Sequence, residues 1–341
     1  MPDRRVHLQG HVGGALFSPG ICQRSAKEPM TLTSPAEPRG ASGRFLLDRG
    51  ASAPLILPAT LLVVVFLVGP FYYMAYTAMT DLSFANPDQK GAFVGFDNFR
   101  HLIRNDTIFW DSFWLTIRFV LAAVSIEFVL GFALALLIWR FVERQRLLTT
   151  LLLVPMMIAP VAVGLIWRLM LQGDFGMATY YLREIGLLSN RTAIFSSPDL
   201  VMPAIIAIDV WQWTPFVTLV MLAGLMSLPR APFEAATMDG AGPWRQFLDV
   251  MLPLLRPVIA LVLLLRGIDA FKEFDKVFIL TGGGPGTVSE LLSIYAYRVN
   301  FKTWNLGYGA AVAFMVYLVV LILCSVFYKA IYWQPARAKT A

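Results

Sequence analysis

Apolar residues gather into long runs that short charged stretches separate. A helix needs about 20 mostly apolar residues to cross the hydrocarbon core of a membrane. Runs of at least that length occur six times, at residues 54–79, 114–139, 147–171, 201–226, 254–280 and 309–333. The pattern predicts an all-α transmembrane fold in which each run is one spanning helix, and residues 51–341 form the membrane domain.

The composition agrees with lipid as the main surrounding medium. Of 341 residues, 57% are hydrophobic and only 15% are charged, which gives more apolar surface than one soluble core could hide. The chain has two cysteines, Cys22 in a polar stretch and Cys324 inside an apolar run. A disulfide framework is therefore not expected.

The first fifty residues are rich in Pro, Gly, Ser and Arg and show no sustained period. Such a segment cannot bury enough apolar surface to order itself, so we expect a disordered cytoplasmic tail. A cleavable signal peptide is not expected, because the first apolar run begins near Pro54 and is too long. Translation could start at Met1 or Met30, and mass spectrometry of the native N-terminus tests this.

Basic residues predict the orientation of the spans, since cytoplasmic loops of membrane proteins carry an excess of Lys and Arg. Arg44 and Arg49 precede the first span, and a short basic stretch that includes Arg140 joins the second span to the third. Both termini then face the cytoplasm, as an even number of spans requires. We read the net charge of +6 as a sign of topology and expect no nucleic-acid partner.

The fifth run carries six charges after Leu265. On one continuous helix, four of them share a narrow stripe: Arg266, Asp269, Glu273 and Lys276. A charge at the bilayer centre costs roughly 2.5 to 3.5 kcal/mol, so these residues must pair with one another or line water. The stripe predicts the wall of a polar translocation path. The alternative is a span that ends early and leaves its charges at the outer interface.

A second polar cluster lies in the fourth run, where Asp209, Gln212, Trp213 and Phe216 share a helix face. Carboxylate and amide groups can satisfy sugar hydroxyls, and aromatic rings pack against the C–H faces of a pyranose. The alternative is that Asp209 pairs with a basic residue on another helix while the tryptophan packs at the interface. The candidate substrate path comprises Asp209, Gln212, Trp213, Phe216, Asp269, Lys272 and Glu273.

The loop at residues 228–253, between the fourth and fifth spans, has the chemistry of a docking helix. A proline begins it, Glu234, Ala235 and Ala236 favour a helix, and Gly240 can turn the chain at its end. Paired alanines would let another protein approach the backbone closely, and Glu234 offers a charge to a basic partner.

The same loop resembles a conserved segment of the permeases of ATP-binding cassette (ABC) importers. The residues that carry the resemblance are Glu234, Ala235, Ala236, Gly240, Val250, Leu252 and Pro253. The stretch from Phe274 to Pro285 and the set Tyr295, Tyr297, Arg298 and Phe301 are similar to the larger maltose permease and its relatives for disaccharides, polyols and glycerol phosphate. The resemblance covers roughly residues 54–333.

The resemblance implies a six-helix importer-type permease core with a cytoplasmic coupling helix formed by Glu234, Ala235, Ala236, Asp239 and Gly240. It further implies a second homologous permease, a dimer of cytoplasmic ATPase subunits that uses ATP and Mg, and an extracytoplasmic solute-binding protein. This chain itself would bind no cofactor and would lie in the bacterial inner membrane. The large insertion of the maltose permease is absent from the sequence, which leaves the docking of the binding protein open.

Several other functions are disfavoured by the residues. No Gly-Lys dipeptide occurs, so the glycines at 282–284 cannot be a Walker loop, and no nucleophile–base arrangement indicates an enzyme. His7 and His11 lack a third ligand, so no metal site is expected. An ion-coupled secondary transporter, with Asp209, Asp269 and Glu273 as coupling carboxylates, is the main alternative. The solute stays open among sugars, polyols and phosphorylated solutes.

Overall fold

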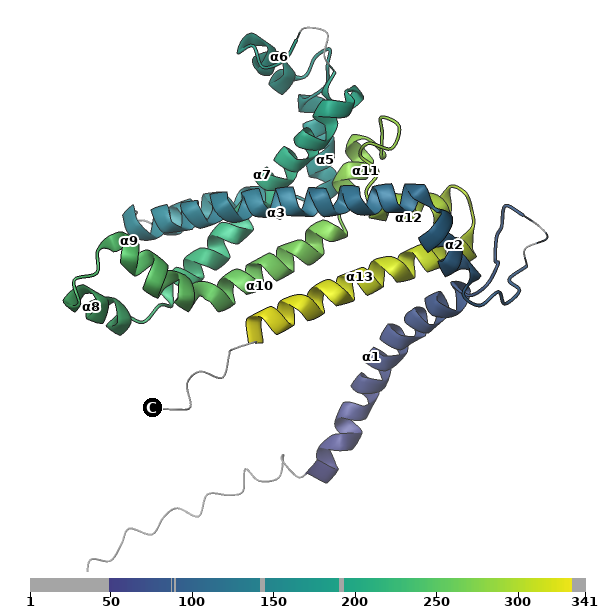
Figure 1. Cartoon of the computed structure of the whole chain (residues 1–341), viewed down its shortest axis with the longest axis horizontal. Coiled ribbons are helices and arrows are strands. Elements are labelled where there is room, and N and C mark those ends of the chain that lie inside the picture. Colours follow the sequence, from purple (N-terminus) through teal and green to yellow (C-terminus); the bar gives the residue numbers. More distant parts are fainter. Residues whose placement is uncertain (1–48, 87, 89, 142–144, 190–192, 333–341) are drawn as a thin grey trace, which may run out of the picture. The chain divides into compact units, whose positions relative to one another are not determined.

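The computed structural model describes residues 49–86, 88, 90–141, 145–189 and 193–332 (Figure 1). The predicted disordered tail falls outside this range up to residue 48, and so do Cys22, Met30 and both N-terminal histidines. Within the described residues the fold is helical, apart from one isolated bridge between Thr80 and Phe93.

Five helical stretches are long and apolar enough to cross a membrane, or six if a bent pair is one span. The long helices are α1 (Arg49–Thr77), α3 (Thr107–Phe141), α7 (Pro198–Met226), α10 (Leu252–Phe271) and α13 (Leu306–Tyr332). The bent pair belongs to α4 (Gln145–Met157) and α5 (Pro160–Met170). Together with α11 (Asp275–Leu280), these helices cover most of each predicted run.

Short elements connect the long helices. They are α2 (Asp97–Asn105), α6 (Met177–Glu184), the 3-10 turn η2 (Ile194–Ser196), α8 (Ala231–Met238), α9 (Pro243–Gln246), the π-helical turn η3 (Phe247–Met251), α11 (Asp275–Leu280) and α12 (Leu292–Phe301). Figure 1 shows α6 beyond one end of α7 and α8 beyond its other end.

The third predicted span is bent by 89° between α4 and α5. Pro160 begins α5, and a proline pushes the residue before it out of the helical region. Ala159 accordingly has an extended backbone, with ψ of 137°. The predicted run at 147–171 is therefore two helices that meet nearly at a right angle.

The fifth span is also interrupted, which corrects the prediction of one continuous helix. The chain leaves α10 at Phe271 and enters α11 only at Asp275. Phe274, just before α11, has a non-helical backbone with φ of −132°. The charged residues at 266–276 therefore do not form one helical stripe, and the two helices direct them separately.

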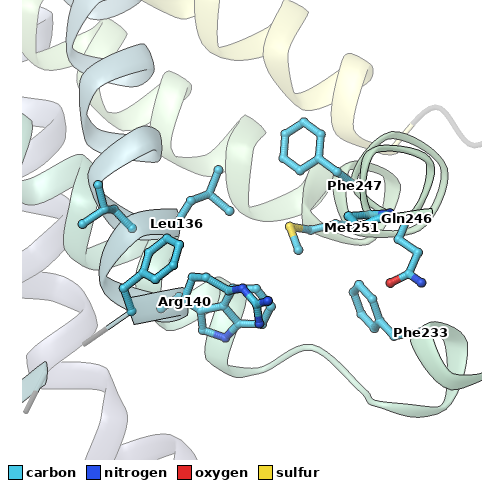
Figure 2. A pocket seen from close by; sticks show the side chains of 10 residues that line it. Leu136, Arg140, Phe233, Gln246, Phe247 and Met251 are labelled. Atoms are coloured by element: carbon cyan, nitrogen blue, oxygen red, sulfur yellow. The ribbon is translucent and has the colours of Figure 1, made fainter. Parts of the chain in front are cut away.

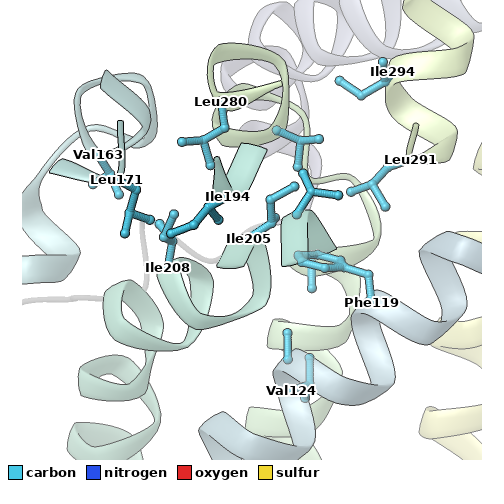
Figure 3. Close-up of a cluster of buried hydrophobic side chains, with 14 residues drawn as sticks. Phe119, Val124, Val163, Leu171, Ile194, Ile205, Ile208, Leu280, Leu291 and Ile294 are labelled. Atoms are coloured by element: carbon cyan, nitrogen blue, oxygen red, sulfur yellow. The ribbon is translucent and has the colours of Figure 1, made fainter. Parts of the chain in front are cut away.

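Three buried hydrophobic clusters follow α3 along its length. Phe109 belongs to a cluster with α12 and α13, Phe119 to one with α5, α7 and α11, and Phe132 to one with α7 and α10. Figure 3 shows the middle cluster, in which Ile205 and Ile208 lie among side chains of several helices. Burial is highest for α7, where 61% of the most apolar window is enclosed, so α7 is the central helix of this part of the chain.

Candidate functional site

The middle of the helical assembly contains a buried set of charged side chains, which we call the ionic hub. Its members are Glu127 on α3, Asp209 on α7, Arg266 on α10, Glu273 in the break of the fifth span and Lys276 on α11. Each is at most 9% exposed. Charges buried this deeply require partners, because removing an ion from water costs several kcal/mol.

Arg266 is the centre of the ionic hub. Its Nε and Nη2 donate to the two carboxylate oxygens of Glu127 at 2.7 and 2.9 Å. Nη2 also donates to Asp209 at 3.0 Å, and Nη1 donates to Asp269 at 3.1 Å. One planar guanidinium group thus joins α3, α7 and α10, which is the bidentate geometry that favours arginine over lysine.

Lys276 extends the hub to α11. Its ammonium group contacts Asp209 and lies 3.1 Å from Glu273 Oε2. Asp209 therefore accepts from two cations on two different helices. At the edge of the hub, Asp269 lies 3.4 Å from Lys272, whose side chain is 64% exposed. The ion pair between Asp269 and Lys272 therefore connects Arg266 to the protein surface.

Trp213 covers the cations of the hub on one side. Its ring centroid is 4.8 Å from the guanidinium carbon of Arg266 and 5.9 Å from Lys276 Nζ, within the range of cation–π attraction. Phe216 packs edge-on against Trp213 at 6.3 Å. These two aromatic rings are partly exposed.

Gln212 has a different role from its neighbours. Its Nε2 donates to the carbonyl oxygen of Ile158 at 3.1 Å, where the bend of the third span frees that carbonyl. Among the described residues, Gln212 Oε1 and Trp213 Nε1 are buried without a hydrogen-bond partner. Gln212 Oε1 could accept one further hydrogen bond, and Trp213 Nε1 could donate one.

The structure divides the residues predicted for the substrate path. Asp209 and Glu273 are buried, and their carboxylates are paired with cations of the protein. Asp209 therefore has the contacts of the alternative given above, in which it pairs with basic residues on other helices. Trp213, Phe216, Asp269 and Lys272 retain exposed atoms. Arg266, Glu273 and Lys276 are buried inside the fold. The alternative of a span that ends early concerns their depth in the membrane, and it stays a prediction.

Sequence reasoning missed Glu127. It is fully buried and forms the bidentate partner of Arg266. The signal was available, because Glu127 is the one acidic residue in the apolar run at 114–139. A lone intramembrane carboxylate is expensive unless it is paired, so the run itself predicts a basic partner elsewhere.

The loop between α7 and α10 forms a second candidate site. No residue of α8 is buried, and Met238 at its end is 88% exposed. Gly240 has φ of +75°, a left-handed conformation that ends the helix and favours glycine. Gln246 donates to Thr237 Oγ1 and to the carbonyl oxygen of Ala241, both at 3.0 Å, which fixes α8 against α9.

A pocket of about 530 Å³ lies between this loop and the end of α3 (Figure 2). Phe233, Phe247 and Met251 form its apolar wall, and Arg140 and Gln246 are polar lining residues. Phe247 stacks on Phe132 at 6.1 Å, so the loop is anchored to α3 by aromatic packing. The loop is therefore joined to α3 by side-chain contact, in addition to its chain connections to α7 and α10.

A third polar cluster joins α12 and α13 to the start of α3. The hydroxyl groups of Tyr295 and Tyr308 both donate to the carboxylate of Asp106. Burial and the hydrogen bond to Asp106 raise the pKa of Tyr295, so its phenol stays protonated and remains a donor. Among the described residues no group of three His, Cys, Asp or Glu side chains could hold a metal ion.

Comparisons with known proteins show which family has this architecture. Residues 127–333 match the family described as binding-protein-dependent transport system inner membrane component. The chain is 33% identical over 302 residues to the sulfoquinovosyl glycerol transport system permease protein SmoG of Agrobacterium fabrum, covering 89% of this chain and 95% of that protein. It is 32% identical over 276 residues to the trehalose/maltose transport system permease protein MalF of Thermococcus litoralis, covering 81% and 91%.

A solved structure agrees in fold. A chain in the crystal structure of a bacterial ABC transporter involved in the import of the acidic polysaccharide alginate superposes with a TM-score of 0.70, at 23% identity over 82% of this chain and 94% of that one. The predicted resemblance is thereby confirmed, and the ion-coupled carrier is excluded. The chain belongs to the binding-protein-dependent family of ABC importer permeases, as a multi-pass inner-membrane transport subunit without catalytic function, among relatives that take up carbohydrates.

Proposed function

We propose that this chain forms half of the membrane path of a carbohydrate importer, with a second homologous permease as the other half. A dimer of cytoplasmic ATPase subunits would use ATP and Mg to drive it, and an extracytoplasmic binding protein would deliver the solute. The names of the relatives support a sugar or a glycosyl glycerol as the solute class, since they include trehalose, maltose and sulfoquinovosyl glycerol permeases.

The observation that carries the proposal is the exposed α8 loop between two long helices. A helix with no buried residue has little reason to fold in isolation, and partner contact would supply the missing burial. Met238 is 88% and Trp244 is 72% exposed. We therefore propose that Glu234, Ala235, Ala236, Asp239 and Gly240 form the surface that docks on the ATPase subunit.

The proposed solute path follows the partly exposed members of the predicted set. Trp213 and Phe216 offer ring faces to a sugar, and Asp269 and Lys272 offer charged groups to its hydroxyls. Asp209 and Glu273 would shape this wall from behind, because protein cations already occupy their carboxylates. In this proposal six spans form the permease core, and both termini face the cytoplasm.

Substitutions in the α8 loop test the proposal. Glu234→Lys reverses the charge offered to the ATPase subunit, and such a change at an interface typically costs about 2–5 kcal/mol of docking free energy. Gly240→Pro is incompatible with the observed φ of +75°. We expect both variants to reach the membrane at normal levels and to lose ATPase association in co-purification, together with ATP-dependent uptake.

The matched control is Asp249→Asn, which removes only an exposed ion pair with Arg245 near the same loop. It should retain association, because exposed pairs contribute about 0–1 kcal/mol. The solute for uptake is found by a ligand screen on the binding protein that co-purifies. Normal association and uptake in the Glu234→Lys variant would contradict the proposed role of α8.

A further inference from the structure

The α8 loop and the ionic hub lie on the same two helices. The loop begins where α7 ends, at Met226, and it ends where α10 begins, at Leu252. Asp209 lies 17 residues before the end of α7 and Arg266 lies 14 residues after the start of α10. At 1.5 Å per residue the hub is about 20–25 Å from the loop along both helices.

At that distance the two helices are joined to each other and to a third. The 3.0 Å contact between Arg266 and Asp209 connects α10 to α7. The contact between Asp209 and Lys276 then connects α7 to α11, the short helix beyond the break of the fifth span. Because α11 is separated from α10 by non-helical residues, these side-chain contacts tie it to α7 and α10 independently of the backbone.

α11 in turn packs closely against α5. A Cβ at Gly164 on α5 would lie 3.1 Å from the side chain of Ile279, so only glycine allows this approach without displacement. Arg168 on α5 donates from Nη1 to the carbonyl oxygen of Ile279 at 2.9 Å. The half-helices beyond the two breaks thus form one packed pair, and the hub links α11 of this pair to α7.

Ionic contacts suit such a connection. Replacing a buried ion pair by apolar residues is often neutral for stability, so stability alone does not explain why the chain carries five buried charges here. Charge pairs are directional, and each has one geometry with full hydrogen bonding. When one helix moves, a fully paired ionic network therefore moves the partner helix with it, whereas apolar contacts allow the two helices to slide past each other.

We propose that the ionic hub transmits movement of the α8 loop to α11, and that Asp209, Arg266 and Lys276 are positioning residues for transport. The inference rests on the proposed function of α8 as the ATPase-docking helix. Displacement of α7 and α10 at the loop would be carried to Asp209 and Arg266. Lys276 would then move α11, together with α5, at the opposite end of the path.

The test follows α11 directly and needs no knowledge of the solute. Asp275→Cys places a thiol on an exposed position of α11 in a chain with Cys22→Ser and Cys324→Ser. The complete importer is reconstituted in proteoliposomes, and labelling by a fluorescent maleimide is timed with and without ATP and vanadate. We expect nucleotide trapping to change the labelling rate by about fivefold or more, in the range of allosteric coupling.

The hub variants Asp209→Asn and Lys276→Met should reduce this change to less than about twofold, while ATP hydrolysis is retained. Lys276→Arg keeps the charge and should restore most of the response. The matched control is Arg100→Gln, which removes an exposed 2.9 Å ion pair with Asp97 and should leave the response unchanged.

Several results would overturn the inference. The first is a full nucleotide response of the labelling rate in the hub variants, and the second is no response in the parent chain. The third is a joint fall of the labelling response, the rate of ATP hydrolysis and the melting temperature, which is expected of a purely structural ion pair. If neither the Asn nor the Met variant assembles, Arg266→Lys decides, because it keeps the charge but cannot reproduce the bidentate contact with Glu127. A full nucleotide response in Arg266→Lys would reject the role. Failure of the proposed function is distinguished by Glu234→Lys, which would then retain ATPase association.

Discussion

Gly131 lies at a close approach of α3 to α7. A Cβ built there would lie 2.7 Å from Cβ of Val217 and 3.1 Å from the carbonyl oxygen of Thr214. These atoms are rooted in the α7 backbone, so they cannot rotate away. We expect Gly131→Ala to destabilise the protein by about 1–3 kcal/mol, the usual cost of overpacking, measured by thermal unfolding in detergent.

The control is Gly267→Ala on α10, where no atom lies within 4 Å of the added Cβ. Its melting temperature should be unchanged or slightly higher, since alanine favours a helix by up to about 1 kcal/mol over glycine. Equal losses in both variants would show that helix propensity, and not the contact with Val217, explains the effect of Gly131.

The roles of single residues were only partly readable from the sequence. The face that carries Asp209, Gln212, Trp213 and Phe216 could be predicted because helical spacing fixes which side chains share a side. Their partners could not, because Glu127 is 139 residues from Arg266 in the chain and pairing at such separation leaves no local pattern. Gln212 was expected to face a solute, yet its amide donates to Ile158, whose free carbonyl exists only because the third span bends.

At the scale of elements, α12 is fixed by a side chain from α3. Thr116 Oγ1 accepts a hydrogen bond from the backbone N–H of Leu292, the first residue of α12, at 2.8 Å. It donates in turn to the carbonyl oxygen of Ser112. The first N–H groups of a helix lack partners within the helix, so Thr116 acts as a cap supplied by another element.

Removal of this hydroxyl should weaken the junction between α3 and α12. We expect Thr116→Val to cost about 1–3 kcal/mol, because it leaves a buried N–H group without an acceptor. Thr116→Ser should retain most of the stability. Hydrogen exchange at Leu292, followed by mass spectrometry, should accelerate in the Val variant alone. Unchanged exchange there would contradict a capping role.

The sequence predicted the long helices well and their interruptions less well. The runs of apolar residues mark α3, α7 and α13 because lipid-facing helices must be apolar along their whole length. Pro160 could have marked the bend of the third span, since a proline disfavours a helical residue before it. The break before Asp275 has no proline to mark it, and the helix that follows is held by contacts with distant residues, such as that between Lys276 and Asp209.

For the whole molecule, the proposed orientation in the membrane is open to a direct test. Met238 on α8 is 88% exposed and Leu187, between the third and fourth spans, is 70% exposed. In a chain without Cys22 and Cys324, Leu187→Cys should react with an impermeant maleimide in intact cells. Met238→Cys should react only after the membrane is permeabilised, because the basic loops face inward. The reverse pattern would exclude docking of α8 on a cytoplasmic ATPase.

The wide turn η3, at Phe247–Met251, sets the angular phase of the helix that follows it. A π-helical turn commonly accommodates one residue more than an α-helical turn does. Loss of that residue would turn every later side chain of α10 by about 100° around the helix axis. Arg266 would then point away from Glu127 and Asp209, although it lies about four turns beyond η3. The pairing of Arg266 therefore depends on the number of residues between α8 and α10 as well as on which residues they are. Insertions and deletions should be tolerated far less here than between α5 and α7.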